Sequence, residues 1–272
     1  MIFANHAHIF PSEIKEKGAP ELLIEQLDYC GIDKAVAFSP FLRQFEDSAL
    51  YFDKDPIEWT AKIVSENSDR MVGFGTIDFD EKHMTITDQI EKMHSLGLKG
   101  IKIHPAYQKL QIDGIKAFKA YQKAQEKGMF LSFHTGLHWH RIKDYSMLLF
   151  DEVAYNFPTL RFSMEHMGGY TFFREALLII CNNKRAPIPH VYAGLTSVAM
   201  GENGLCGTWS LTDNEIETLI FQTGENMTIF GLDFPYNNSE YNKKAIDRIR
   251  NLNISDTAKA NILGNTLAEI LL

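Results

Sequence analysis

The chain alternates short apolar runs with longer amphipathic stretches, and it does so eight times over its 272 residues. Runs rich in β-branched and aromatic residues are typical of strands, while apolar residues three and four positions apart indicate helices that bury one face. The strand-like runs span residues 2–10, 34–40, 71–78, 100–105, 129–136, 161–168, 190–197 and 227–235. Eight such βα units predict a (β/α)8 TIM barrel, a fold whose usual size is about 250 residues.

No low-complexity linker divides the sequence, so residues 1–272 are predicted to form one domain. A doubly wound open sheet is the main alternative, but no glycine-rich phosphate turn follows the first strand-like run. Helix-end signals support the alternation. They are Asp55 before Pro56, a capping box of Thr212 and Glu215, and Gly31, Gly97 and Gly128 after three amphipathic stretches. The segment after Ser255 is predicted to add a helix on the outside of the barrel.

Charge and composition narrow the class of partner. The formal net charge is −8 and the basic residues are scattered, which argues against nucleic acid because affinity for its backbone rests on clustered Lys and Arg. No apolar run of about 18 residues and no signal peptide are found, so we expect no membrane association and a cytoplasmic location. The three cysteines form no CxxC pair and suggest neither a disulfide framework nor a zinc knuckle. A small-molecule substrate is therefore the expected partner, and the composition is compatible with a homo-oligomer.

Ionisable side chains fall near the ends of five strand-like runs. They are His6 and His8 in the first run, and His104, His134, His166 and Asp233 in the fourth, fifth, sixth and eighth. An isolated His-x-His pair is more often a surface or hydrogen-bonded core feature than a metal site. Here, however, the carboxyl ends of all barrel strands meet at one rim, and ionisable groups in apolar runs are costly unless paired or ligated. The pattern therefore favours a catalytic divalent metal, with zinc preferred over manganese or iron.

These residues lie in stretches that resemble a known family. HAHIF, GIKIHPAYQ, FHTG, EHMGG, FGLDFPY and NILGNTLAEILL, in this order, are similar to the amidohydrolase superfamily, in particular to its amidohydrolase-2 branch of mononuclear hydrolases and decarboxylases. The resemblance implies that one metal is held by His6, His8, His134 and Asp233. It also implies that His166 orients or polarises water and substrate, and that His104 is a further pocket residue.

Lys102 bears on the number of metals. Binuclear members of the superfamily bridge two ions with a carboxylated lysine on the fourth strand, and Lys102 shares a strand face with His104. The preferred interpretation is an uncarbamylated lysine that binds a substrate carboxylate or pairs with a pocket acid. Tyr107 and Arg141 are further candidates for substrate contacts, with a solvated loop as the alternative for Arg141. Glu165 alternates with its neighbour His166, so we expect it to face away from the barrel axis in a structural role.

The function that these residues favour is hydrolysis of a small carboxylated or cyclic substrate, such as a lactone or an amide. A divalent ion lowers the pKa of bound water toward ~7, Asp233 would act as the base, and His166 would stabilise the developing charge. Non-oxidative decarboxylation is the alternative, and a non-catalytic barrel is a second one. A TatD-type deoxyribonuclease is disfavoured because its extra glutamate ligand is missing from VGFGTIDFD. Two interpretations remain for the loop with Gly201, Gly204 and Gly207: a lid over the site, or a simple connecting loop before the next helix.

Overall fold

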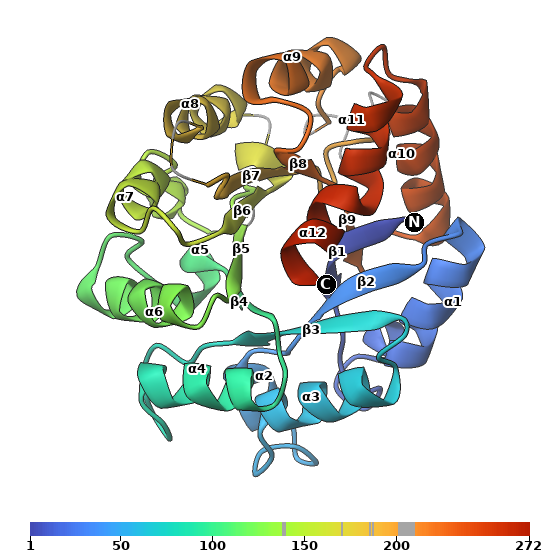
Figure 1. Ribbon diagram of the computed structural model, residues 1–272. Helices are drawn as coiled ribbons and strands as arrows, with labels where there is room; N and C mark the ends of the chain where they lie inside the picture. The colour runs from blue at the N-terminus through green and yellow to red at the C-terminus, as the bar shows by residue number, and fades with distance from the viewer. Residues whose placement is uncertain (138–139, 170, 185, 187, 201–209) are drawn as a thin grey trace.

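The strands form one parallel sheet in which neighbours in sequence are neighbours in space, in the order β8-β7-β6-β5-β4-β3-β2-β1-β9. The computed structural model describes residues 1–272 except 138–139, 170, 185, 187 and 201–209. The strands are β1 (Phe3–His8), β2 (Lys34–Phe38), β3 (Met71–Thr76), β4 (Gly100–Ile103), β5 (Phe130–His134), β6 (Phe162–Glu165), β7 (Val191–Gly194), β8 (Thr228–Ile229) and β9 (Gly231–Phe234). A ring of helices surrounds them (Figure 1), so the predicted TIM barrel is confirmed.

Helices fill the connections between strands. Those of the ring and its loops are α1 (Pro20–Cys30), α2 (Leu42–Glu46), α3 (Pro56–Glu66), α4 (Ile86–Ser95), α5 (Pro105–Gln108), α6 (Ile115–Glu126), α7 (Leu149–Asn156), α8 (Phe173–Asn183), α9 (Asp213–Thr223) and α10 (Ser239–Asn251). Three short 3-10 segments, η1 (Glu16–Gly18), η2 (Ile142–Tyr145) and η3 (His166–Gly168), lie in the loops. No helix among the described residues is long and apolar enough to cross a membrane.

The eighth predicted strand is divided into two in the structure. The backbone N–H of Phe230 donates to Ile262 O at 2.9 Å, outside the sheet, while Phe230 O accepts from Asn5 N at 2.8 Å. β8 therefore pairs with β7 on one side of this break, and β9 pairs with β1 on the other. The two halves together close the barrel.

The predicted helix ends are confirmed. Asp55 accepts a hydrogen bond from Ile57 N at the start of α3, and Thr212 forms a capping box with Glu215 at the start of α9. Gly31, Gly97 and Gly128 have φ of 66°, 82° and 64° after α1, α4 and α6. Glycine adopts this left-handed conformation without the steric cost that a side chain would bring.

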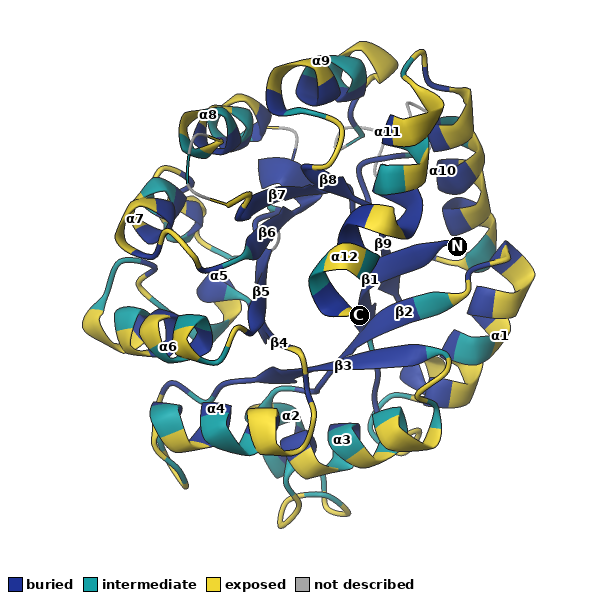
Figure 2. Ribbon diagram, viewed as in Figure 1, coloured by how far each residue is buried: buried dark blue, intermediate teal, exposed yellow. Residues whose placement is uncertain are grey.

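The barrel core is built from buried strands and the inner faces of the helices, as the dark strands and the yellow outer helix faces in Figure 2 show. On α4, Ile86, Ile90 and Met93 are fully buried. Gly75 on β3 lets this helix come close, because a Cβ there would lie 2.5 Å from Met93 Sδ. The apolar face of α4 and the absence of a side chain at Gly75 together allow the helix to pack closely on β3.

The C-terminal segment does not pack on the outside of the barrel as predicted. It forms α11 (Asp256–Ala260), the π-helical η4 (Asn261–Asn265) and α12 (Thr266–Leu271), and α12 lies at the centre of the helix ring in Figure 1. A Cβ on Gly264 would lie 2.5 Å from Phe3 N, so η4 is in tight contact with the start of β1. Leu267 and Leu271 are buried there. The segment covers the N-terminal end of the barrel. The apolar core is exposed at this end unless another segment packs on it, just as the outer face of the sheet is exposed unless a helix packs on it.

Several strands end earlier than predicted, and at two of these ends a predicted site histidine lies outside the strand. His104 and His166 are expected inside strands, but each comes directly after its strand has ended. His104 is the N-cap of α5, where its Nδ1 accepts from Tyr107 N at 3.2 Å, and Pro105 follows it. His166 has a φ of 68° and begins the 3-10 segment η3, which follows β6 directly. The predicted lid loop with Gly201, Gly204 and Gly207 lies outside the described residues.

Candidate active site

His6 on β1 lies at the centre of a cluster of ionisable side chains. Its imidazole is buried, and its ring centroid lies 5.0 Å from that of His8 and 4.9 Å from that of His166. The backbone of β1 has a register shift between Asn5 and Ala7, and His6 has a φ of 70°. Such a bulge re-aims a side chain, so local backbone geometry sets the direction of this imidazole.

Two sets of metal-capable donor atoms meet here. In each set, the atoms lie within 4.8 Å of one another. The sets are His6, His134 and His166, and His6, His8 and Asp233. The structure therefore brings together the histidines and the aspartate predicted from four separate strand ends, and it makes His166 as well placed a donor as His134.

Backbone strain concentrates at this rim. Seven non-glycine residues among those described have positive φ, and five of them belong to the cluster or adjoin it. These are His6, His166, Met167, Ser197 and Asp233, with φ between 47° and 70°. A non-glycine residue in this region costs on the order of 1–3 kcal/mol, and such residues gather at functional sites. The surrounding structure therefore holds these residues in strained conformations and so fixes the directions of their side chains.

Asp233 is held by a chain of hydrogen bonds. Its Oδ1 lies 3.5 Å from His6 Nε2, and its Oδ2 accepts from Ser197 Oγ at 2.7 Å. Asn237 Nδ2 in turn donates to Ser197 Oγ at 3.0 Å. Burial raises the pKa of Asp233 to about 6, against the opposing effect of the Ser197 hydrogen bond. Sequence analysis did not identify Ser197 and Asn237, because both lie in loops and neither belongs to a sequence motif that indicates a site.

Lys102 is a buried cation in the floor of the site. Its Nζ lies 3.3 Å from His6 Nε2 and 5.1 Å from the centroid of the Phe38 ring. Burial lowers the pKa of Lys102 to about 7, while the carboxylates of Glu165 and Asp233 oppose that shift. The charges of these two carboxylates therefore act on Lys102.

Glu165 does not face away from the site as the strand alternation predicts. Its side chain is fully buried, and its Oε2 lies 3.5 Å from His6 Nδ1. Burial raises the pKa of Glu165, and hydrogen bonds from Ser163 and Thr196 oppose this. Since β6 ends at Glu165 and His166 has positive φ, the alternation stops between the two residues. Both side chains can therefore lie in the same cluster.

The other buried histidines are anchored by main-chain oxygens. His166 Nδ1 lies 2.9 Å from Thr196 O, and His134 Nε2 lies 2.9 Å from Gly136 O. A carbonyl partner fixes which ring nitrogen carries the proton. His104 stacks on His134 with ring centroids 3.9 Å apart. His104 therefore packs against one of the clustered histidines.

Rings from several loops surround His104. Tyr107 is 36% exposed, and its ring centroid lies 4.8 Å from that of Phe41 and 6.4 Å from that of His140. Arg141 is largely exposed and pairs with Asp144 on its own loop at 3.1 Å. The structure therefore brings Tyr107 to His104, with ring centroids 5.9 Å apart, whereas the exposed guanidinium of Arg141 pairs within its own loop. His138 and Trp139 lie outside the described residues.

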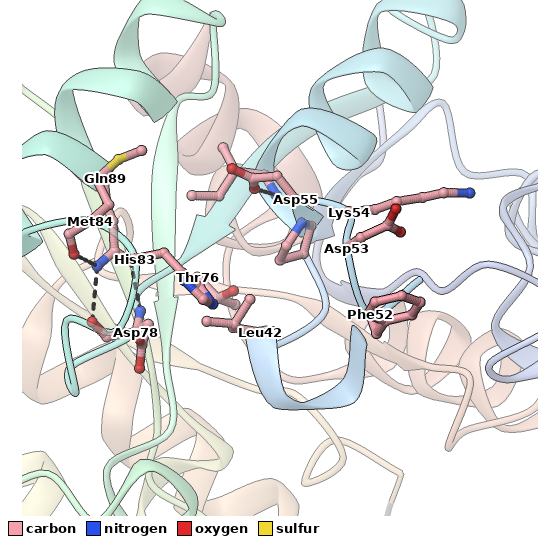
Figure 3. A pocket seen from close by; sticks show the side chains of 12 residues that line it. Leu42, Phe52, Asp53, Lys54, Asp55, Thr76, Asp78, His83, Met84 and Gln89 are labelled. Carbon is pink, nitrogen blue, oxygen red and sulfur yellow. Dashed lines mark hydrogen bonds between the residues drawn. The ribbon is translucent and has the colours of Figure 1, made fainter. Parts of the chain in front are cut away.

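A separate cavity of about 280 Å³ lies among α2, α3 and the segment before α4 (Figure 3). None of the clustered histidines lines it. Two of its polar groups have local partners: Gln89 Nε2 donates to the carbonyls of Asp78 and Met84, and Asp55 caps α3 and pairs with Lys92.

Comparisons with known proteins identify the family. A model of the amidohydrolase family matches residues 46–271, and the chain belongs to this family of enzymes. No curated protein matches the chain. The fold is similar to that of 5-carboxyvanillate decarboxylase from Sphingomonas paucimobilis, with 16% identity, a TM-score of 0.73, and coverage of 99% of this chain and 98% of that one.

Two further solved structures share the fold. A dihydroxybenzoic acid decarboxylase from Polaromonas sp., with manganese and the inhibitor 2-nitroresorcinol bound, has 12% identity and a TM-score of 0.70, covering 99% of this chain and 96% of its own. A probable 2-pyrone-4,6-dicarboxylic acid hydrolase from Acinetobacter baumannii, with citric acid bound, has 12% identity and a TM-score of 0.67, covering 99% and 98%. At such identities the likeness is one of fold.

Proposed function

We propose that the chain is a metal-dependent enzyme that binds one divalent ion and hydrolyses a small carboxylated or cyclic substrate. The proposed ligands are His6, His8, His134 and Asp233. The observation that carries the proposal is the convergence of two donor sets that share His6, each within 4.8 Å, at a strained and buried rim. Ionisable groups gathered in this way are too costly to serve packing alone.

The residues fit a first-row divalent ion. Several imidazole nitrogens with one carboxylate are a donor set that suits zinc, iron(II) or manganese. Manganese is bound in the Polaromonas decarboxylase and in a 5-carboxyvanillate decarboxylase from Novosphingobium aromaticivorans. Zinc, predicted from the sequence, and manganese are therefore the two ions to test.

When bound, the ion would lower the pKa of a water molecule and polarise a substrate oxygen. The protein's own groups would handle the proton. Asp233, whose Oδ2 is held by the Ser197 hydroxyl, would accept the proton and later return it to the leaving group. His166, held through Nδ1 by the Thr196 carbonyl, would stabilise negative charge on the attacked oxygen.

Substrate contacts are proposed for His104, Tyr107, Lys102 and Arg141. His104 and Tyr107 belong to a group of rings that would stack on a flat or cyclic substrate. Lys102 would balance the charge of a substrate carboxylate or of the two pocket acids whose charges act on it. Arg141 would have to leave Asp144 before it could bind a substrate carboxylate.

Non-oxidative decarboxylation is the second candidate. The observation that favours it is the fold shared with decarboxylases, one of them, a 2,6-dihydroxybenzoate decarboxylase, complexed with 2,6-dihydroxybenzoate. The same groups would serve, with Asp233 or His166 as the acid that protonates the ring or enamine carbon. The two reactions differ in product, because only decarboxylation releases carbon dioxide.

The test is metal analysis of the purified protein beside its His8→Ala variant, after incubation of each with zinc or manganese and removal of the excess. We expect about one equivalent per chain, with loss of most of it in the variant. Metal-loaded protein is then screened on lactones, amides and aromatic acids, with carbon dioxide release measured in parallel. Two equivalents would point to a bridging Lys102. An absence of metal in both proteins, with the same melting temperature with and without the ions, would refute the enzyme and favour the non-catalytic barrel.

A further inference from the structure

We propose that Glu165 is a positioning residue, whose caged carboxylate holds the imidazole of His6 in the orientation that presents Nε2 to the metal site. The inference deepens the proposed function and rests on it for the identity of the metal site. It assigns a role to a residue that strand alternation turns away from the site, and it rests on three features of the fold.

The first feature is the cage itself. Glu165 Oε1 accepts hydrogen bonds from Asn5 Nδ2 at 2.7 Å and from Ser163 Oγ, while Oε2 accepts from Thr196 Oγ1. The donors come from β1, from β6 and from the segment after β7. Three neutral donors around one buried carboxylate compensate the loss of its hydration. Each oxygen is thereby fixed in place.

The second feature is the space left by glycines on two strands, β7 and β9. A Cβ on Gly194 of β7 would collide with the carboxylate of Glu165. A Cβ on Gly231 of β9 would collide with Thr196 Oγ1 and lie 3.3 Å from His6 Cβ. No larger residue fits at either position while the carboxylate and its donor stay where they are. The two glycines and the cage therefore belong to one arrangement.

The third feature is the direction of the His6 ring. Its Nδ1 faces Glu165 Oε2 at 3.5 Å, while its Nε2 lies 3.5 Å from Asp233 Oδ1 and 3.3 Å from Lys102 Nζ. A negative charge beside Nδ1 favours the tautomer that carries its proton there, which leaves the lone pair on Nε2 for the metal. His134 and His166 each have a main-chain carbonyl beside one ring nitrogen, and His6 has a carboxylate beside its Nδ1.

The test compares wild-type protein with Glu165→Gln, which keeps the size of the side chain and removes its charge. Binding of Mn²⁺ alone is measured by competition with a chelating dye. Loss of a carboxylate that orients a metal-binding histidine weakens affinity by about 10–100-fold, and we expect that range here with the stoichiometry unchanged. In the metal-free proteins, ¹⁵N NMR of histidine reports the tautomer. We expect the Nδ1–H form of His6 in wild type and a mixture in the variant.

Two further variants keep the result interpretable. Ser132→Ala removes another buried hydroxyl of the barrel, on β5, and should change neither affinity nor tautomer. If Glu165→Gln does not fold, Thr196→Val tests the cage by removing one donor, with an expected loss of affinity of about 3–10-fold, below the full range. Circular dichroism establishes the fold of each.

The outcomes separate the two proposals. Wild-type Mn²⁺ affinity in Glu165→Gln, or weaker binding with an unchanged His6 tautomer, overturns the positioning role and leaves the metal-dependent enzyme intact. If wild-type protein binds no metal, the proposed function fails. The NMR comparison then still decides whether Glu165 controls His6, and an unchanged tautomer would overturn that claim as well.

Discussion

Replacing Ser197 with alanine should raise the pKa of Asp233 in the metal-free protein. Ser197 Oγ donates to Asp233 Oδ2 at 2.7 Å, a hydrogen bond that stabilises the ionised carboxylate against the cost of burial. Removing it disfavours the charged form, so the sign of the change is upward. A hydrogen bond to a charged group contributes about 1.5–3 kcal/mol, and one pKa unit corresponds to about 1.4 kcal/mol. The expected rise is therefore about 1–2 units.

Starting from the wild-type value of about 6, Asp233 in Ser197→Ala should titrate between about pH 7 and 8. The assay is ¹³C NMR of aspartate carboxyl groups across a pH series, with Asp233→Asn used to assign the signal. Ser39→Ala is the control, because Ser39 is equally buried but donates to the carbonyl of Pro56. The neighbouring Asn237 amide could replace the lost donor, so Ser197→Ala/Asn237→Ala is measured too. A pKa that stays the same or falls in both variants would refute the reasoning.

Two further predictions concern the stability of the barrel. Burial lowers the pKa of His190, so its contribution to the free energy of unfolding is present above the unfolded value of about 6.5 and is lost as the pH falls through the lower folded value. His190→Gln should flatten that acid-side loss in urea denaturation, and an unchanged slope would contradict it. Thr212→Ala removes the N-cap of α9 and should cost about 1 kcal/mol in urea denaturation. Metal binding should not change, and a change there would mean that α9 influences the site.

The alternation of strands and helices was enough to predict the barrel, because each period reflects which face of an element is buried. The ends of the strands were less predictable. His104 and His166 lie in apolar runs that are typical of continuous strand, yet the strand ends first, at an N-cap interaction of His104 and at a 3-10 turn that begins with His166. Local hydrogen bonds and strain decide such boundaries, and neither is encoded in hydrophobic periodicity.

Glu165 shows the same limit within the site. Alternation on a regular strand turns it away from His166, and the interpretation as a purely structural residue followed from that. The structure instead has Glu165 3.5 Å from His6, because the strand stops at the residue where alternation was assumed to continue. Ser197 ends the seventh strand-like run and Asn237 follows the eighth, but a hydroxyl and an amide at such positions are too common to indicate a site.

The sequence alone determined the barrel, the rim where its chemistry gathers, and the histidines and aspartate that point there, because periodicity and strand-end position are local properties that any TIM barrel converts into shared geometry. Only the tertiary structure decided that the C-terminal helices cover the barrel's N-terminal end, that Lys102 and Glu165 lie beneath His6, and that Ser197 holds Asp233. These contacts join residues far apart in the chain, and strained backbone and glycine-sized gaps set them. Such constraints arise only when the strands have paired in the folded barrel.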